Sequence, residues 1–427
     1  MNSLINAALC EGFTEPIRDS LWGHIYLTPE IEALTKSLAF IRLHRVAQLG
    51  SACLCYPGAT HTRAAHSLGV YHLTRRLLVN LAERGADEWL TPCGVRSMLC
   101  AALFHDLGHF PYAHSLKELP LLRHEFLSAK AIGTEPLRTL IGKTGADPEL
   151  TAAIVDDELP DGAYGTELKF YRKLLSGCLD PDKLDYLNRD ARFCGVPYGA
   201  HDVDFIISTL YPHPERGVDI DSRGITGVES ILFSKYLMYR SVYWHHSVRS
   251  ATSMIKKALF AGLKDGVITP QELYNLDDQE LFHCLSAREH PLFKLGSYVR
   301  QGRLYAMAAE FPFDDSRHGA LSDLEKRSEL EIDLAKELSS AAGKSFCPND
   351  IIIDVPESFS FETGLFVRDE NCYFCDSSSF FKTDEVGAFA KTLRIVRVFV
   401  DQAYKPIVKS SIVGVVEKRL DARCAGG

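Results

Sequence analysis

Apolar residues recur at helical spacing through most of the first 300 residues of the chain. The first predicted helix runs from Pro29 to about Gly50. Its apolar face would consist of Ile31, Leu34, Leu38 and Ile41. A second helix is expected to open near His61 and to continue to about Glu83.

A third helix is expected to begin near Pro92, because proline is favoured in the first helical turn and Thr91 can cap it. Further segments with helix-spaced apolar residues lie at 124–132, 149–157, 167–177 and 181–191, and a long one covers 225–264. Helices are expected to continue to about residue 310.

The pattern changes after residue 310. A charged helix is predicted at 321–342, and the segments that follow it are rich in branched and aromatic residues, which is typical of strands. These predicted strands are Asp350–Val355, Phe361–Val367, Cys372–Phe374 and Leu393–Val400. We therefore expect a mainly α-helical protein, with a helical body at 1–310 and a small α+β C-terminal domain at 311–427.

Charge and composition narrow the classes of protein. A net charge of −9 gives no general reason to expect nucleic-acid binding, although a local basic pocket stays possible. No apolar run approaches the roughly 20 residues that span a bilayer, and the N-terminus lacks the pattern of a signal peptide. The 12 cysteines are scattered irregularly, which indicates reduced thiols in the cytoplasm. The one Cys-x-x-Cys, Cys372 to Cys375, has no second pair nearby, so a zinc site there is disfavoured.

The first stretch with candidate chemistry is Ala102–His114, in which an apolar run stops at the adjacent pair His105 and Asp106. His109 follows one helical turn after His105, so the two are expected to share a helix face. Imidazole and carboxylate groups together suit a divalent metal ion such as Fe, Mn, Zn, Ni, Co or Mg. The alternative is a capped helix end with solvated histidines.

The second stretch is Leu179–Asp190, which carries more acidic side chains than a helix cap requires. Together the two stretches and the helix near residue 66 offer two imidazoles and two carboxylates, namely His66, His105, Asp106 and Asp182. Two carboxylates balance one divalent cation, and four protein ligands leave coordination positions open for water and substrate. With Arg63 and Lys183 nearby in the same stretches, a phosphoester hydrolase fits this set.

These residues carry a resemblance. The sequence resembles the HD-domain phosphohydrolase superfamily, and within it the deoxynucleoside triphosphate triphosphohydrolases, without a SAM domain. The matching segments, in chain order, are Gly23–Ile25, Arg42–Gly50, Tyr56–Ala59, His61–Val70, Phe104–His114, His124–Glu125, Leu179–Asp190, Asp350–Pro356 and Leu393–Phe399.

The resemblance implies a role for each matching position. The metal ligands would be His66, His105, Asp106 and Asp182. The catalytic residues would be His124, His109 and Asp106. His124 or, as an alternative, His109 would be the general acid or the group placed near the α-phosphorus and the leaving oxygen. The substrate, a deoxynucleoside triphosphate, would contact Gln48, Leu49, Arg63, His114, Lys183, Tyr186 and Asp190. The resemblance also implies a homo-oligomer.

Several alternatives stay open. Arg63 could be a surface charge at a helix start, Tyr186 could be a core residue, and His61 is expected at the surface. For His245, His246 and Arg249, a phosphate contact and a place in a buried aromatic helix explain the pattern about equally well. The competing functions are hydrolysis of another nucleotide and a nucleotide sensor that does not catalyse.

Overall fold

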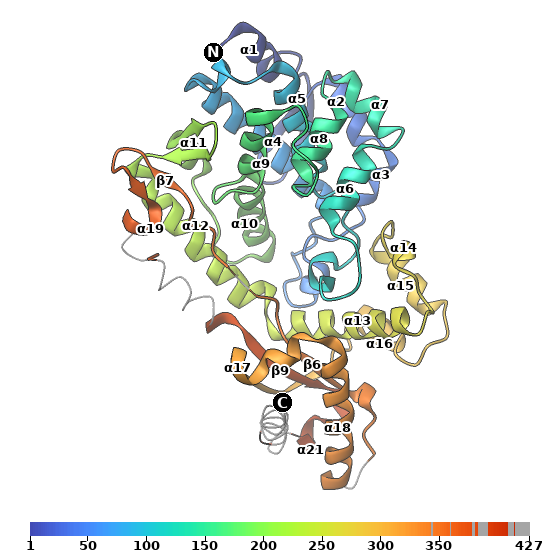
Figure 1. The fold of residues 1–427 in the computed structure, drawn as a ribbon. Helices are drawn as coiled ribbons and strands as arrows, with labels where there is room; N and C mark the ends of the chain where they lie inside the picture. The colour runs from blue at the N-terminus through green and yellow to red at the C-terminus, as the bar shows by residue number, and fades with distance from the viewer. Residues whose placement is uncertain (343–344, 359, 378–380, 383–391, 409–413, 415–427) are drawn as a thin grey trace.

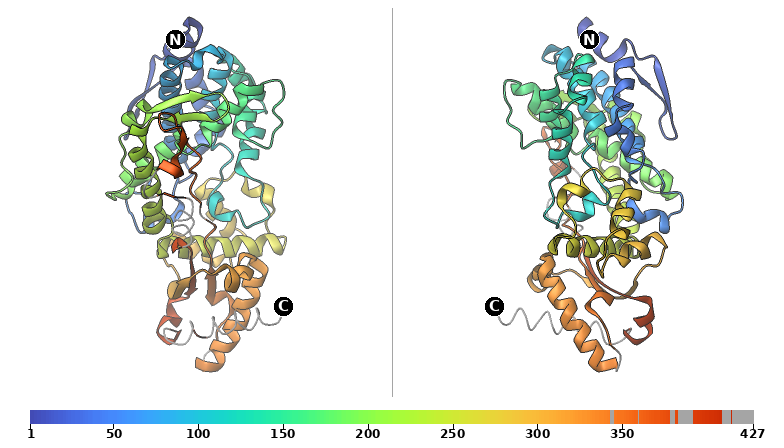
Figure 2. Two further views of the ribbon diagram at one scale, coloured as in Figure 1. Left: turned by 60° about the vertical axis from the view of Figure 1, so that its left-hand side comes forward. Right: turned by 90° about the vertical axis from the view of Figure 1, so that its right-hand side faces the viewer.

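The computed structural model describes residues 1–342, 345–358, 360–377, 381–382, 392–408 and 414 of the chain. The protein is mainly α-helical, as predicted, with small sheets at its edges. Figure 1 shows a large helical body near the N-terminus and a smaller layer with strands β9 and β6 at the opposite end. Both views in Figure 2 keep this second layer, coloured orange, below the body. No helix in the described ranges combines the length and the apolar character needed to cross a membrane.

The helical body begins with helix α1 and a hairpin. Its elements are α1 (Ser3–Cys10), β1 (Glu15–Asp19), β2 (Gly23–Leu27), α2 (Pro29–Thr35), α3 (Leu38–Leu43), α4 (Arg63–Glu83), α5 (Pro92–Phe104), α6 (His124–Ile132), α7 (Leu137–Lys143), α8 (Pro148–Val155), α9 (Gly165–Leu175), α10 (Pro181–Cys194), α11 (Val203–Ser208), β3 (Leu210–His213), β4 (Gly217–Ile220) and α12 (Ile225–Met238). After α12 come α13 (His246–Lys264), α14 (Pro270–Leu273), α15 (Asp278–Ser286) and α16 (Lys294–Arg300).

Helices α4, α5 and α10 form the centre of this body. The side chain of Thr62 accepts a hydrogen bond from the first turn of α4, and Thr91 does the same for α5, with Pro92 in the first turn as predicted. Both helices bury most of their length, and α10 packs against α4. The beginnings of α4 and α10 and the end of α5 therefore carry the candidate site.

The prediction of a single helix from Pro29 to about Gly50 is wrong. The chain forms two short helices, because the Ser37 hydroxyl accepts a hydrogen bond from the Phe40 amide and starts α3 anew. This break turns Leu38 outward, with 87% of its surface exposed, and it buries Phe40 instead. The apolar residues from Ile31 to Ile41 therefore belong to two helices, α2 and α3, which turn different faces toward the core.

The long helix predicted at 225–264 is interrupted. Helix α12 ends at Met238, a π-helical turn covers Tyr239–Tyr243, and α13 begins at His246. A π-turn rotates the side chains that follow it relative to the regular helix, and such turns are frequent at functional sites.

The C-terminal layer is a three-stranded antiparallel sheet in the order β5-β9-β6, with the long helix α18 (Leu324–Ala342) beside it. Its strands are β5 (Ala306–Pro312), β6 (Ile351–Asp354) and β9 (Ile395–Val400), and it also holds α17 (Asp315–His318) and α21 (Lys405–Val408). The strands predicted at 350–355 and 393–400 are confirmed. The charged helix predicted at 321–342 is confirmed too.

The chain then returns to the helical body. Strand β7 (Phe366–Val367) pairs in parallel with β4 through Val367 and Ile220, and β8 (Cys372–Tyr373) and α19 (Phe374–Ser377) follow it. Phe361, Leu365 and Phe374 are buried in the core of the body. Strand structure in the predicted segment 361–367 is limited to its last two residues. The division into domains at residue 310 remains a prediction, since residues on both sides of it share one core.

Candidate active site

A cavity of about 460 Å³ lies where α4, α5, α10, α12 and α13 approach one another. Its wall includes every residue proposed above for metal or substrate contact, together with the acid candidate His124. These residues are Gln48, Leu49, Arg63, His66, His105, Asp106, His114, His124, Asp182, Lys183, Tyr186 and Asp190. His109 is fully buried behind this wall. Residues from six separate segments of the sequence therefore meet around one space.

His66, His105 and Asp182 present one ligand atom each within 4.8 Å of one another. His66 Nε2 lies 2.9 Å from Asp182 Oδ1, and His105 Nε2 lies 3.8 Å from the same oxygen. His105 Nδ1 contacts the Ala102 carbonyl, which directs Nε2 toward the cluster, where this buried atom has no hydrogen-bond partner. Asp106 stands at the edge, 3.5 Å from His105 Nε2. An unpartnered buried nitrogen among imidazole and carboxylate donors fits a divalent metal ion.

The charges in the cluster support the same interpretation. Burial opposes the charged form of His66, but hydrogen bonds to Asp182 and Asp185 outweigh it and raise its pKa to about 10. Burial favours a neutral Asp182, yet His105 and His66 hold its pKa well below the usual range. The cluster thus concentrates negative charge, which a divalent cation would help to balance.

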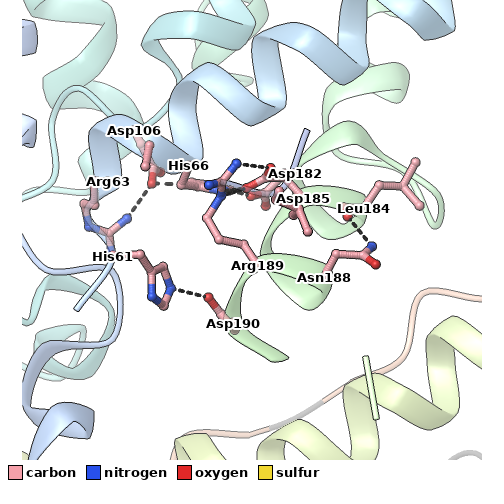
Figure 3. A network of polar contacts seen from close by, with 12 residues as sticks. His61, Arg63, His66, Asp106, Asp182, Leu184, Asp185, Asn188, Arg189 and Asp190 are labelled. Atoms are coloured by element: carbon pink, nitrogen blue, oxygen red, sulfur yellow. Dashed lines mark hydrogen bonds and ion pairs between the residues drawn. The ribbon is translucent and has the colours of Figure 1, made fainter. Parts of the chain in front are cut away.

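A network centred on the buried Asp185 and Arg189 fixes the orientation of His66 (Figure 3). Asp185 Oδ2 lies 2.8 Å from His66 Nδ1, and Arg189 donates two hydrogen bonds to the Asp185 carboxylate at 2.8 and 2.9 Å. Trp22 Nε1 donates to Asp185 at 2.6 Å, and Arg189 also reaches Asp19 at 2.8 Å. With Asp185 as the acceptor at Nδ1, Nε2 faces Asp182, and it is the nitrogen that would bind a metal ion after losing its proton. Asp185 is therefore a positioning residue that the motif analysis did not assign.

His109, His114 and His124 form a second cluster, also with ligand atoms within 4.8 Å of one another. His109 Nε2 lies 3.0 Å from His114 Nε2, and the His109 and His124 rings are 3.8 Å apart. Burial lowers the pKa of His109 and His124 well below the usual value, which favours their neutral forms. Glu125 lies 3.2 Å from His124 Nδ1 and can orient that ring.

The prediction that His105 and His109 share a helix face is wrong. Helix α5 ends at Phe104 and His105 is its C-terminal cap, after which the chain turns through Asp106 to His109. The turn directs His105 to one cluster and His109 to the other, with Asp106 between them, 3.0 Å from His109 Nδ1. The guanidinium of Arg42 holds this turn by donating to the carbonyls of Leu107 and His109 at 2.7 Å.

Several basic side chains line the cavity. Arg63 is buried and donates to Asp106 at 2.5 Å, so it is not a surface charge. Lys183 donates to Asp180 at 2.6 Å and lies 2.9 Å from Glu362. Lys117 and Lys235, which the sequence analysis did not propose, also line the cavity. Only spatial proximity could have identified them, since neither belongs to a short motif.

Polar groups line another wall. Asp190 accepts from the hydroxyl of Tyr243 at 2.6 Å and contacts His61 Nε2 at 2.7 Å. The expectation that His61 lies at the surface is wrong, because only 4% of it is exposed and the carboxylate of Asp190 satisfies it. Tyr186 lines the cavity and also packs against the core, so both interpretations of it hold. Gln48 Oε1 is buried without a partner in this structure.

The residues near the π-turn differ in whether they line the cavity. Arg249 lines the cavity, but its guanidinium binds Asp354 through two hydrogen bonds of 2.7 and 2.8 Å. His245 and His246 do not line the cavity, and His245 packs edge-on against Tyr56 at the start of α13. The π-turn itself contributes Tyr239 and Tyr243 to the cavity wall.

Two known protein-family models match this chain. Residues 63–160 match the HD domain, and residues 202–384 match the HD associated region. The first match contains His66, His105 and Asp106, and it ends before Asp182. The chain belongs to the HD-domain phosphohydrolase superfamily, and the side-chain cluster at its cavity is able to hold the metal on which HD domains depend.

Two curated relatives illustrate the range of similarity. The chain is 32% identical over 271 residues to the uncharacterized protein YwfO of Bacillus subtilis, and the match covers 58% of this chain and 60% of that protein. It is 23% identical over 377 residues to the deoxynucleoside triphosphate triphosphohydrolase SAMHD1 homolog of Dictyostelium discoideum, which covers 79% of this chain and 66% of the relative. The chain thus spans about three fifths to two thirds of these relatives.

A solved structure covers nearly the whole chain. It belongs to a hypothetical protein from Aquifex aeolicus, superposes with a TM-score of 0.72 at 26% identity, and covers 93% of this chain and 99% of its own. The helical body and the C-terminal layer therefore occur together in that protein as well.

Proposed function

We propose that the protein is a metal-dependent hydrolase of deoxynucleoside triphosphates, which releases the deoxynucleoside and tripolyphosphate. The observation that carries the proposal is the cavity itself, in which the cluster of His66, His105 and Asp182 faces a row of cations and a polar wall. The resemblance of the motifs and the name of the Dictyostelium relative support the same substrate class.

The metal ion would be held by His66, His105 and Asp182, with Asp106 as the fourth candidate at 3.5 Å from His105. When bound, it would supply Lewis-acid polarisation of a phosphoryl oxygen and would lower the pKa of a water molecule. The mixed nitrogen and oxygen ligands suit Fe, Mn, Zn, Ni, Co or Mg.

Arg63 and Lys183 would bind the oxygens of the triphosphate, because a cation beside a phosphate forms a charge-assisted hydrogen bond about twice as strong as a neutral one. His114 opens into the cavity and would contact the same oxygens. His124 would donate a proton to the leaving oxygen, with His109 as the alternative donor. Burial keeps the pKa of His124 low in this structure, and the negative charge of a bound polyphosphate would raise it again.

The sugar and base would lie against the polar wall. The carboxylate of Asp190, held by His61 and Tyr243, can accept a hydrogen bond from a 3′-hydroxyl, and the ring of Tyr186 can pack against the sugar. Gln48 and Leu49 would contact the nucleoside, since the buried Oε1 of Gln48 still needs a donor. An acceptor that is buried without a donor costs about 1–3 kcal/mol, which a substrate hydrogen bond would recover.

The assembly and location are part of the same proposal. The resemblance supports a homo-oligomer, and the free thiols of the cysteines in the described ranges suit a reducing cytoplasm.

The test is an analysis of products by anion exchange. Purified protein is incubated with each dNTP alone and then with all four together, in the presence of Mn, Mg, Fe or Co in turn. Deoxynucleoside with intact tripolyphosphate supports the proposal, and activity in the mixture alone adds an activating nucleotide to it. Orthophosphate or pyrophosphate as the first product would overturn the proposal in favour of another nucleotide hydrolase.

A pair of variants gives the control. Asp182→Asn removes one carboxylate of the cluster and is expected to abolish product release, whereas Asp157→Asn, whose side chain is 77% exposed on the surface, is expected to leave it unchanged. Tight nucleotide binding by a wild-type protein that shows no turnover would favour a sensor instead.

A further inference from the structure

Glu362 reaches the cavity from the segment that returns to the helical body, and it lies between two buried lysines. Its Oε2 is 2.9 Å from Lys183 Nζ on α10 and 3.6 Å from Lys235 Nζ on α12. The carbonyl of Ser360, two residues earlier, accepts a hydrogen bond from Lys235 at 3.1 Å. The returning segment therefore places the carboxylate of Glu362 beside the ammonium groups of Lys183 on α10 and Lys235 on α12.

The two lysines are held more firmly in the cavity wall than the carboxylate of Glu362. The side chains of Lys183 and Lys235 are 11% and 8% exposed and extend from regular helices, and Lys183 is also held by Asp180 and the Gly177 carbonyl. The Glu362 side chain is 45% exposed and belongs to a stretch without regular secondary structure. The carboxylate can therefore move into water at a small cost, whereas the ammonium groups stay in the wall.

Three other acids that contact a cation of the cavity, Asp106, Asp180 and Asp354, are held more firmly. Asp106, which binds Arg63, and Asp354, which binds Arg249, are 6% and 1% exposed as side chains. Asp180, the second partner of Lys183, is 1% exposed. Among these carboxylates Glu362 is the one that solvent and a ligand can reach.

A carboxylate and a phosphate oxygen make the same kind of contact with an ammonium group, and two anions cannot share it without repulsion. We infer that Glu362 occupies a polyphosphate subsite formed by Lys183 and Lys235, so that an incoming polyphosphate must displace it. This inference rests on the proposed function in assigning Lys183 to the triphosphate. Glu362 then weakens the binding of every ligand whose phosphate reaches both lysines, and it does not touch the reacting atoms.

The test measures the binding of inorganic tripolyphosphate to the full-length protein by isothermal titration calorimetry, in excess EDTA and at fixed ionic strength. Glu362→Gln keeps the shape of the side chain and removes its charge. We expect it to tighten binding about tenfold, which corresponds to about 1.4 kcal/mol. Glu357→Gln is the matched control, because Glu357 lines the same cavity on the same segment but faces Arg249 at 3.4 Å.

The outcomes separate the explanations. Tighter binding by Glu362→Gln and not by Glu357→Gln supports the inference, and a melting curve of each variant shows that both are folded. Equal gains in both variants would mean a general effect of charge and would overturn it, as would unchanged or weaker binding by Glu362→Gln. Failure of the proposed function is seen separately, because it appears as missing dNTP turnover by the wild type, whereas tripolyphosphate binding is measured without turnover.

Discussion

Exchange of Asp185 for asparagine tests how the network behind the cluster prepares His66. Asp185 is completely buried, and it receives hydrogen bonds from Trp22 and Arg189 in addition to its contact with His66. An asparagine amide keeps the shape, but the group facing His66 Nδ1 can become a donor. The imidazole would then carry its proton on Nε2, where a metal ligand needs a lone pair.

We expect Asp185→Asn to lower both the metal affinity and the free energy of unfolding. Loss of a partner that orients a metal ligand costs about 10- to 100-fold in metal affinity. Removal of one charge from a buried ion pair costs about 3–5 kcal/mol, and we expect the lower end because Arg189 retains its bond to Asp19 at 2.8 Å. Metal affinity is measured by calorimetry with Mn²⁺, and the free energy of unfolding by urea titration of the EDTA-treated protein.

The control is Asp219→Asn on β4. Asp219 is also buried and binds Arg216 through two hydrogen bonds of 2.6 and 2.8 Å, but it does not line the cavity. It should lower stability by about 1–3 kcal/mol and leave metal affinity unchanged. If Asp185→Asn loses stability but binds Mn²⁺ as tightly as the wild type, the orienting role assigned to Asp185 is refuted.

Three further predictions concern other parts of the structure. Arg42→Gln removes the hydrogen bonds to the carbonyls of Leu107 and His109, so it should lower kcat and reduce the free energy of unfolding by about 2–3 kcal/mol. A loss of stability with unchanged kcat would show that the turn keeps its shape without Arg42. Burial alone would raise the pKa of Asp354, but Arg249 outweighs it and lowers the pKa, so the stabilisation is present above pH of about 4 and is lost on further acidification. The difference in unfolding free energy between wild type and Asp354→Asn should therefore shrink below that pH, and a constant difference would contradict the assignment. A divalent metal at 100 times its dissociation constant should stabilise the wild type by about 2.7 kcal/mol in thermal melts, and His105→Ala should lose this gain.

The sequence was sufficient where local chemistry determines structure. Thr91 and Pro92 predicted the start of α5, and acidic residues before Lys183 predicted the start of α10, because capping depends on neighbours in the chain. The same logic applies to Ser37, whose hydroxyl caps α3 and divides the helix predicted from Pro29, although the apolar spacing runs across it.

The rest depends on contacts between distant residues. Asp185 looks like one more acid in a charged helix until Arg189 and Trp22 are seen to surround it. His61 looks like a surface residue until Asp190, 129 positions later, covers it. The cavity cation Lys235 and its partner Glu362 belong to no motif, and only the folded chain brings them together.

The parallel pairing of Val367 with Ile220 also sets an order of events during synthesis. A ribosome produces the chain from its N-terminus, so the cluster of His66, His105 and Asp182 can assemble before the segment with Glu362 exists. Pairings that distant in sequence form late, because a long loop must close first. In a nascent chain, Lys183 and Lys235 would therefore lack the carboxylate of Glu362 until that late segment docks.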